Sequence, residues 1–388
     1  MRHYLTRLGI AFAAFIAAAA CINLLVDPYR LWNPPVGLDA AAPRPRAVQH
    51  DASLKLRGIA RTRPVTLILG NSRAEIGFDP RATAWPAAMH PVYNAAVPGA
   101  SLGMAEAALA SGIAAGRLRT AVVGLDFLDF LVASNESVEP AAPAAPRTND
   151  LSVLISLDTL IDSGVTVLQR HDPDAADVDA SGFNPLHEYR RYAREEGYAS
   201  IFRQRDATNA RTYVKSPKGI FVNGGTESAS WRELERLVAT ARAADIRLEF
   251  VIYPYHARIL EMFYHAGLAP AFKQWKRELA RRLPATATGS CSVWDFSGYS
   301  EFTTESVPAA GDRTSTTRWY WESGHFKSEL GSVMLERMYD GSGSFGTCLT
   351  ESSVGMENAR LDAGHESFAK RHPDVAAGVL KLFSSASP

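Results

Sequence analysis

The sequence has few cysteines, no excess of charge of either sign, and none of the common metal-binding spacings. Its 388 residues contain three cysteines, and neither HExxH nor a paired CxxC occurs. Lys and Arg together number 41, as do Asp and Glu, and no long basic run follows the first few residues. This balance excludes the basic surface that is typical of nucleic-acid-binding proteins. We therefore expect no metal, no organic cofactor and no nucleic-acid partner.

Only one hydrophobic run is long enough to cross a membrane. Residues 8–26 carry no charge, and nineteen helical residues span about 28 Å, close to the hydrocarbon thickness of a bilayer. Arg2 and Arg7 precede the run and Asp27 follows it. The positive-inside rule therefore places residues 1–7 in the cytoplasm and the rest of the chain outside. We expect a single-pass anchor in a bacterial inner membrane, with the soluble part in the periplasm.

A cleaved signal peptide is the alternative to this anchor, because the Ala-rich stretch offers small residues to a signal peptidase. The apolar run continues through Val26, past any plausible cleavage site, which favours an uncleaved anchor. Lipid attachment at Cys21 is disfavoured because no bulky aliphatic residue lies three positions before it. In an oxidising compartment Cys291 and Cys348 either form a disulfide or remain two separate buried thiols.

The rest of the sequence alternates strand-like and helix-like segments. Residues 65–70, VTLILG, are the strongest strand signal, because a continuous apolar run ending in Gly is typical of a parallel sheet covered on both faces. Strands that alternate with helices predict an α/β fold built on a parallel sheet. We expect strands at 65–70, 92–93, 246–254 and 291–296 and from 121 onward, and helices at 52–62, 151–169, 184–204, 226–244, 255–282 and 325–338, with a further helix after the glycines of PGASLG.

Three segments lack such patterns. Residues 27–51, which include DPYRLWNPP, are dense in aromatic residues and prolines and predict an extended membrane-proximal stalk. Residues 134–150 are rich in Pro, Ala and polar residues and predict a surface loop rather than a domain boundary. Residues 341–388 contain GSGSFG and a weakly helical end, which predict a partly ordered tail. We therefore expect one α/β domain at 52–340.

The first candidate site is GNSRA, residues 70–74, directly after the strongest strand. A serine that ends a strand and opens a helix lies where α/β sheets place their ligand crevice. The N–H groups at the start of that helix can stabilise a developing oxyanion. The alternative is that Asn71 or Ser72 only caps the helix.

The second candidate site is WESGHF, residues 321–326, just before the last amphipathic segment. Glu322 lies three residues before His325 across a tight turn that contains Gly324, so its carboxylate can reach the imidazole Nδ1. That contact would orient Nε2 as a general base. The alternative is that His325 caps the following helix, since an isolated ExxH pair is common by chance.

Together these segments resemble the sequence blocks of the SGNH, or GDSL-type, hydrolase superfamily. GNSRA resembles the nucleophile block, WESGHF the histidine block, and NAAVPG at 94–99 the second block. The phrases DPYRLW, VVGLDFLDF, DFSGYSEFTTE and WYWESGHFKSELG also resemble a group of membrane-anchored bacterial relatives of mostly unassigned function. The order of the blocks covers about residues 60–340. The resemblance implies a three-layer, flavodoxin-like α/β fold.

The resemblance also implies a role for each matching residue. Ser72 would be the nucleophile, His325 the general base and Glu322 the acid that orients it. The backbone N–H groups of Ser72 and Gly99 would form the oxyanion hole. Family members usually have Asp rather than Glu as the acid, and the turn can absorb the extra methylene.

The third block departs more sharply from the family pattern. It normally reads G-x-N-D, and its Asn side chain donates to the oxyanion. Here GLDF places Asp126 at that position, where an ionised carboxylate would repel an oxyanion. Losing such a donor costs about 10²–10³ in rate. Either another group substitutes, Asp126 points elsewhere, or catalysis is weak.

A competing nucleophile lies in GASLG, residues 99–103, which matches the G-x-S-x-G elbow of α/β-hydrolases around Ser101. A helical pattern follows it, and a histidine comes later in the chain. However, Pro98 interrupts the strand that should run directly into such an elbow. This favours Ser72 over Ser101.

Four further side chains are candidates for substrate binding. His256 ends the strand at 246–254 and either faces the crevice or is structural. Arg73 either binds an anionic sugar or forms an ordinary ion pair. Trp321 either stacks on a sugar ring or packs in the core. Asp126 is the fourth, because of its place in the third block.

The sequence thus predicts an esterase or O-acetyltransferase that acts through Ser72 on glycans of the cell envelope or on exopolysaccharide. The acyl group, most simply acetyl, would pass to water or to a carbohydrate hydroxyl. The rival hypothesis is a polysaccharide-binding or assembly protein that keeps the fold without the reaction, which Asp126 supports. Protein partners and oligomeric state are left open.

Overall fold

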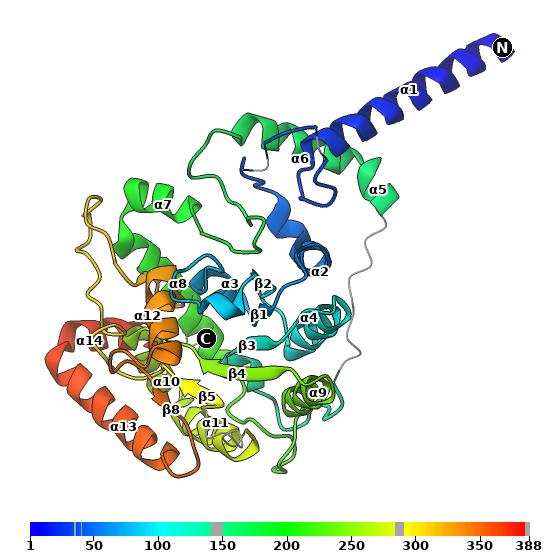
Figure 1. The fold of residues 1–388 in the computed structure, drawn as a ribbon. Helices are drawn as coiled ribbons and strands as arrows, with labels where there is room; N and C mark the ends of the chain where they lie inside the picture. Colours follow the sequence, from blue (N-terminus) through cyan, green and yellow to red (C-terminus); the bar gives the residue numbers. More distant parts are fainter. Residues whose placement is uncertain (35, 40, 141–149, 284–290, 385–388) are drawn as a thin grey trace.

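The centre of the fold is one six-stranded sheet with the order β2-β1-β3-β4-β5-β8 (Figure 1). The computed structural model describes residues 1–388 except 35, 40, 141–149, 284–290 and 385–388. The strands are β1 (Thr66–Leu69), β2 (Val92–Asn94), β3 (Thr120–Leu125), β4 (Arg247–Ile252), β5 (Val293–Asp295) and β8 (Thr347–Cys348). The first five are parallel and β8 joins β5 in antiparallel orientation. The expected parallel α/β sheet is confirmed.

The sheet is covered on both faces, as its continuous apolar strands require. Every residue of β1 and β3 is buried. Crossovers between parallel strands are right-handed, so the change of direction between the β1–β2 and β2–β3 connections puts α3 (Ser72–Gly77) and α4 (Leu102–Ala114) on opposite faces. α4 packs against α2 (Asp51–Thr62) and α9 (Ala229–Ala243), whereas α3 packs against α12 (Ser328–Tyr339) (Figure 1).

The other expected helices are present, but three of them, at 151–169, 184–204 and 255–282, are each divided into two helices. The segment 151–169 forms α5 (Asp150–Leu154) and α6 (Leu157–Gln169), because the hydroxyl of Ser156 caps a new helix start. The segment 184–204 contains α7 (Glu188–Glu196) and the start of α8 (Tyr198–Lys215), separated by Gly197 at φ +79°. After β4 come α10 (Ala257–His265) and α11 (Ala269–Arg282). The remaining short elements are a hairpin of β6 (Tyr320–Glu322) and β7 (His325–Phe326), and the 3₁₀ helices η1 (Ala47–His50), η2 (Ala87–Met89) and η3 (Phe127–Phe130).

The N-terminal run forms the helix α1 (Arg2–Val26), which projects from the domain (Figure 1). It is long and apolar enough to cross a bilayer, and most of its side chains are exposed. Cys21 is a free, exposed thiol on this helix.

The expectation of an extended stalk at 27–51 is corrected, because this segment packs on the domain. Arg30 is buried and pairs with Asp177 at 3.1 Å, and its Nε donates to the carbonyl of Val178 at 3.0 Å. Arg44 is buried as well and donates its backbone N–H to Asp177 at 2.9 Å. A buried guanidinium requires fixed partners, and these partners hold the segment against residues 177–178.

The C-terminal residues, expected as a partly ordered tail, also fold onto the domain. They form β8, α13 (Val354–Arg371) and α14 (Pro373–Ser384). Leu361, Phe368 and Val379 are buried, so these helices dock through apolar side chains although their amphipathic pattern in the sequence is weak. Cys291 and Cys348 form a disulfide, with their Cα atoms 5.6 Å apart. It joins the start of the β5 segment to the edge strand β8.

Candidate active site

The chain turns sharply between β1 and α3, and this turn presents Ser72. Gly70 adopts φ +142°, and a Cβ there would lie 2.6 Å from the hydroxyl of Tyr253, so only glycine fits. Asn71 is the N-cap of α3, and its side chain accepts the N–H of Arg73 at 3.1 Å. Ser72 is therefore the first helical residue and not the cap. Its side chain is free for another contact.

That contact is with a histidine 253 positions later in the chain. The Oγ of Ser72 lies 2.9 Å from Nε2 of His325. His325 begins β7, and its Nδ1 hydrogen-bonds to Oε1 of Glu322 at the end of β6. The other oxygen of Glu322 accepts the backbone N–H of Gly324 at 2.7 Å. The structure thus places hydroxyl, imidazole and carboxylate in one row.

The environment of Glu322 keeps its carboxylate ionised. The side chain is buried, which alone would raise the pKa, but the adjacent His325 ring and the N–H of Gly324 outweigh burial and lower the pKa below its usual value. An ionised acid on Nδ1 leaves Nε2 as the acceptor for the proton of Ser72. The row can therefore activate the hydroxyl as a nucleophile.

Two polar contacts fix the hairpin that carries Glu322 and His325. The Nε of Arg73 donates to the carbonyl of Gly324 at 2.7 Å, which ties the hairpin turn to the helix of Ser72. On its other side, the hydroxyl of Ser323 donates to the buried Asp206 of α8, which also pairs with Arg258. These contacts come from distant parts of the chain and pre-organise the pair.

The site lies at the point where the order of the sheet reverses. β1 has β2 on one side and β3 on the other, and Ser72 and Asp126 follow the carboxyl ends of β1 and β3. Open α/β sheets form their ligand crevice at such a switch point. The geometry of the sheet and that of the side chains therefore indicate the same site.

Two backbone N–H groups are available as oxyanion donors. In the described part of the chain, neither the N–H of Ser72 nor that of Gly99 donates to a protein acceptor. Gly99 is exposed and has φ +67°. The N–H of Val97 donates to the carbonyl of Gly70 at 3.0 Å, which ties the loop of Gly99 to the turn of Ser72. These free donors fit the oxyanion role that the resemblance implies.

Asp126 uses both carboxylate oxygens for hydrogen bonds within the protein. One oxygen accepts from Arg73 and from the side-chain amide of Asn71 at 2.9 Å. The other accepts from the hydroxyl of Tyr255 at 2.9 Å and from the N–H of Leu128 at 3.2 Å. Asp126 is thus the counter-ion of Arg73 and the cap of η3. Of the three explanations for its presence, the structure supports the one in which it points elsewhere.

This arrangement makes a counterintuitive prediction for Asp126→Asn, which would introduce the side chain that the SGNH pattern has at this position. We expect the variant to lose activity and about 2–3 kcal/mol of stability, because Arg73 would be left buried without its counter-ion. Urea unfolding and ester hydrolysis should be measured on the same preparation. Higher activity in the variant would contradict this account of Asp126.

Ser101, the competing nucleophile, lies outside the row. It precedes α4 and is exposed, and across the described residues its hydroxyl has no hydrogen bond to a histidine. β2 ends at Asn94, so no strand runs directly into Ser101 as an elbow requires. The structure brings Ser72 and not Ser101 to His325.

His256, expected at the crevice edge or in a structural role, has the structural one. It is the N-cap of α10, where Nδ1 accepts the N–H of Arg258 at 3.2 Å, and Nε2 lies 3.0 Å from the carbonyl of Glu305. Both ring nitrogens are therefore used within the protein. Burial lowers the pKa of His256 from 6.5 to about 3.

The neutral His256 gives the fold a dependence on pH. In the unfolded chain His256 binds a proton below about pH 6.5, whereas in the folded chain it stays neutral down to about pH 3. The free energy of unfolding therefore falls as the pH drops from 6.5 to 3. We expect His256→Asn, which retains a capping acceptor, to reduce this slope by about 1 kcal/mol per pH unit. Urea unfolding of both proteins at several pH values checks this. Equal slopes would contradict it.

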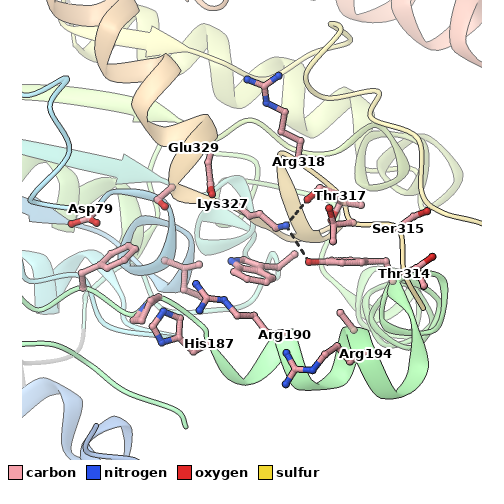
Figure 2. A pocket seen from close by; sticks show the side chains of 18 of the residues that line it. Asp79, His187, Arg190, Arg194, Thr314, Ser315, Thr317, Arg318, Lys327 and Glu329 are labelled. Atoms are coloured by element: carbon pink, nitrogen blue, oxygen red, sulfur yellow. Dashed lines mark hydrogen bonds between the residues drawn. The ribbon is translucent and has the colours of Figure 1, made fainter. Parts of the chain in front are cut away.

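Arg73 and Trp321 differ in their access to ligands. The side chain of Arg73 is 11% exposed and its guanidinium pairs with Asp126, so the ordinary ion pair is the arrangement present. Trp321 is largely buried but lines a cavity of about 870 Å³ beside the site (Figure 2). Ile76, one turn after Ser72 on α3, lines the same cavity. Its other walls come from residues 79–81 after α3, from 183–187, from α7 and the start of α8, and from 313–318 and 327–329.

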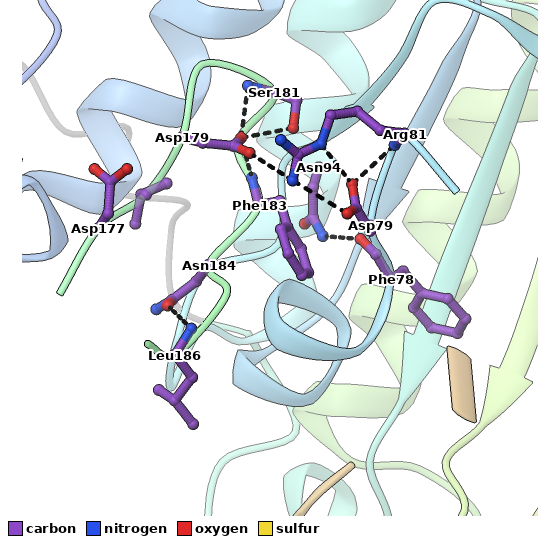
Figure 3. A network of polar contacts seen from close by, with 12 residues as sticks. Phe78, Asp79, Arg81, Asn94, Asp177, Asp179, Ser181, Phe183, Asn184 and Leu186 are labelled. Carbon is purple, nitrogen blue, oxygen red and sulfur yellow. Dashed lines mark hydrogen bonds and ion pairs between the residues drawn. The ribbon is translucent and has the colours of Figure 1, made fainter. Parts of the chain in front are cut away.

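A polar network next to this cavity fixes the far end of α3 (Figure 3). The side chain of Asn94, at the end of β2, donates to the carbonyls of Ala74 and Phe78 at 3.0 and 2.9 Å. Arg81 bridges Asp79 and Asp179, each at 3.0–3.1 Å. In the NAAVPG segment, Asn94 therefore positions α3, the helix that begins with Ser72.

Sequence reasoning missed two buried groups that support the site. Asp206 anchors the turn of the hairpin, as described above. Lys55 of α2 forms a fully buried ion pair with Glu75 of α3 at 2.8 Å. Neither belongs to a motif, and the only signal in the sequence is a charge on a helix with an apolar face.

The comparisons with known proteins do not identify the chain. No protein-family model and no curated protein matches it. The assignment of a function therefore depends on the geometry of the site.

Proposed function

We propose that the chain is a serine-dependent esterase or O-acyltransferase of the SGNH type, with Ser72 as nucleophile, His325 as general base and Glu322 as the orienting acid. The observation that carries the proposal is the row of hydrogen bonds from Ser72 through His325 to Glu322 at the switch point of the sheet. The order 2-1-3-4-5 of the parallel strands is that of flavodoxin-like folds, which supports the SGNH type.

The geometry supports a two-step reaction. The Oγ of Ser72 attacks the carbonyl carbon of the ester while Nε2 of His325 accepts its proton. The N–H groups of Ser72 and Gly99 stabilise the oxyanion, which collapses and releases the alcohol with the proton from His325. In the second step water or a sugar hydroxyl gives its proton to His325 and attacks the acyl carbon, the bond to Oγ of Ser72 breaks, and His325 returns the proton to Oγ. The products are a carboxylic acid or a new ester.

The proposed location is the outer face of a bacterial inner membrane, with α1 as the anchor. The length and hydropathy of α1 support a membrane span, and Arg2 and Arg7 favour an N-terminus in the cytoplasm. The disulfide between Cys291 and Cys348 fits an oxidising compartment. An enzyme tethered there meets glycans of the envelope or exported polysaccharide, which are the proposed acyl acceptors or donors.

A non-catalytic glycan-binding protein is the second candidate, and it is favoured by the missing Asn donor at position 126. One labelling experiment separates the enzyme from the binding protein. The full chain in detergent is treated with a fluorophosphonate probe, and the labelled peptide is mapped by mass spectrometry in the wild type, Ser72→Ala and Ser101→Ala. We expect label on Ser72 in the wild type and in Ser101→Ala, and none in Ser72→Ala. Absence of label from the wild type would favour the binding protein.

A further inference from the structure

The cavity of about 870 Å³ beside the site is strongly cationic. Two carboxylate residues line it, Asp79 and Glu329, and Asp79 already pairs with Arg81. The basic residues in its lining are Arg81, Arg190, Arg194, Arg313, Arg318 and Lys327. Arg81 and Arg194 pair with Asp179 and Asp174 outside the lining, so the unbalanced positive charge of the cavity comes from Arg190, Arg313, Arg318 and Lys327.

Lys327 is the most unusual of these groups because it is buried, with 8% of its surface exposed. Its Nζ donates to the hydroxyl of Tyr198 at 3.1 Å and to the carbonyl of Thr317, as Figure 2 shows. It also lies 4.5 Å from the ring centre of Trp321. No carboxylate of the described residues lies within 4 Å of this ammonium. Glu305 interacts with this ammonium electrostatically without touching it, so the direct contacts of the buried cation are neutral groups, which favours an anion beside it.

On the opposite wall, α7 places Arg190 in the cavity (Figure 2). This side chain is exposed and forms no ion pair with any residue that the structure describes. Trp321, Phe183 and Tyr198 add aromatic surface to the lining. Fixed cations next to aromatic rings are suited to a ligand that has a carboxylate on an apolar-faced ring, which is the chemistry of an acidic sugar. The volume exceeds what an inorganic anion needs.

We propose that this cavity binds an acidic saccharide unit, with its carboxylate near Lys327 and Arg190. This inference rests on the proposed function and adds a substrate class to it. Trp321 directly precedes Glu322, and Ile76 lies one turn after Ser72, so a glycan held there would extend past the nucleophile. The substrate class would then be uronate-containing polysaccharide.

The test is binding of an oligogalacturonide by the full chain in detergent, followed by calorimetry, with a neutral oligosaccharide of equal length for comparison. We expect the acidic oligomer to bind more tightly, and Arg190→Glu and Lys327→Met each to weaken it by about tenfold or more. Arg211→Glu is the matched control, since Arg211 is exposed on α8 and does not line the cavity, and it should bind as the wild type does. Higher salt should weaken the acidic oligomer only.

Equal binding of the two oligomers, or unchanged affinity in Arg190→Glu, would overturn the proposal. Displacement of the acidic oligomer by inorganic phosphate at an equal concentration would also overturn it, because a site for any anion would then explain the binding. The outcome is independent of the nucleophile: Ser72→Ala should bind the oligomer as well as the wild type. If the fluorophosphonate experiment fails while binding persists, the cavity stands and the enzyme proposal falls.

A second inference concerns α6, whose amphipathic pattern is inverted. Its polar side chains Thr159 and Ser163 are buried, at 2% and 0% exposed. Leu157, Ile161 and Leu168 lie at helical spacing and are 57%, 65% and 86% exposed. A helix that buries its polar face and exposes its apolar face requires an apolar partner.

The polar face of α6 packs against the last turns of α1 (Figure 1). The side-chain amide of Asn23 donates to the carbonyls of Leu154 and Ser156 at 2.8 and 3.2 Å, and its oxygen accepts the hydroxyl of Ser163 at 3.0 Å. Asn23 lies about 5 Å before the end of α1 at Val26. If α1 spans the membrane, α6 begins at the depth where acyl chains meet headgroups.

We infer that the exposed apolar face of α6 inserts into the outer leaflet of the membrane that α1 crosses. Ile22, Leu24 and Leu25 at the end of α1, the helix that α6 packs against, are exposed apolar residues as well. The acidic residues of α6, Asp158 and Asp162, give no attraction to anionic lipid, so apolar insertion is the source of binding. This inference rests on the proposed membrane span.

The test uses the full chain, one copy per lipid nanodisc, with single spin labels in a Cys21→Ser background. Labels at 161 and 168 should be more accessible to oxygen than to a water-soluble nickel chelate, and this should not depend on the content of anionic lipid. A label at Arg211 is the aqueous control, and one at Phe12 of α1 reports the span itself. A lipid signal at 12 with an aqueous signal at 161 would overturn only this inference. A signal at 161 that appears only with two copies per disc would assign the face to a second copy and overturn it as well.

Discussion

Ser72→Ala is expected to slow the hydrolysis of p-nitrophenyl acetate by about four orders of magnitude. The hydroxyl of Ser72 is the proposed nucleophile, and among the described residues it is the hydroxyl that lies 2.9 Å from Nε2 of His325. His325→Ala should cost about as much, because the two residues act as a unit. The double variant should therefore be no slower than either single variant. Steady-state rates of the full chain in detergent provide the measurement.

Two controls accompany this series. Ser101→Ala should keep the wild-type rate, since Ser101 lies outside the row. Glu322→Gln should fall by up to about 10⁴, because a neutral amide no longer holds the required tautomer of His325. Additive losses in the double variant would mean that Ser72 and His325 act separately, which the hydrogen bond between them contradicts.

Lys55→Met is expected to have the largest effect on stability, a loss of about 3–5 kcal/mol. Lys55 and Glu75 are both fully buried, 2.8 Å apart, and Lys55 also donates to the carbonyl of Gly182. Removing the lysine leaves the carboxylate of Glu75 without its cation inside the protein. Asn184 donates to the same carboxylate at 3.2 Å but carries no charge.

Urea unfolding measures this loss, and two further variants interpret it. The double variant Lys55→Met with Glu75→Gln should recover part of the stability, because no unpaired charge remains. Lys370→Met, at an exposed position on α13, should change stability by less than about 0.5 kcal/mol. If Lys55→Met loses no more stability than Lys370→Met, the claim that the Lys55–Glu75 pair stabilises the helix of Ser72 is wrong.

The sequence predicts the parallel sheet and the two ends of the row because both depend on local patterns. The apolar run at 65–70 can be stable only as a strand covered on two faces, and the residues that follow it must lie at the sheet edge. Glu322 and His325 are three residues apart across a turn, so their contact is also local. The meeting of Ser72 with His325 is different. It depends on the order of the strands in the sheet, which no local sequence pattern reveals.

Long-range polar pairs explain the parts that sequence reasoning missed. Residues 27–51 appear to be a stalk because Pro and aromatic residues suggest exposed coil, whereas Arg30 and Arg44 are buried against Asp177. The helix α13 has few apolar residues in each turn, and its docking depends on a small number of side chains such as Leu361 and Phe368. The orientation of Asp126 is likewise set by Arg73 and Tyr255, neither of which a motif links to it.

The central claim is that Ser72 forms the acyl intermediate with His325 as its base. The most direct measurement is rapid mixing of the full chain with p-nitrophenyl acetate, followed by acid quench and peptide mass mapping. We predict a burst of p-nitrophenol close to one per chain and one acetyl group on the peptide that contains Ser72, both lost in Ser72→Ala. An acetyl group on any other residue, or a burst that survives in Ser72→Ala, would contradict the account.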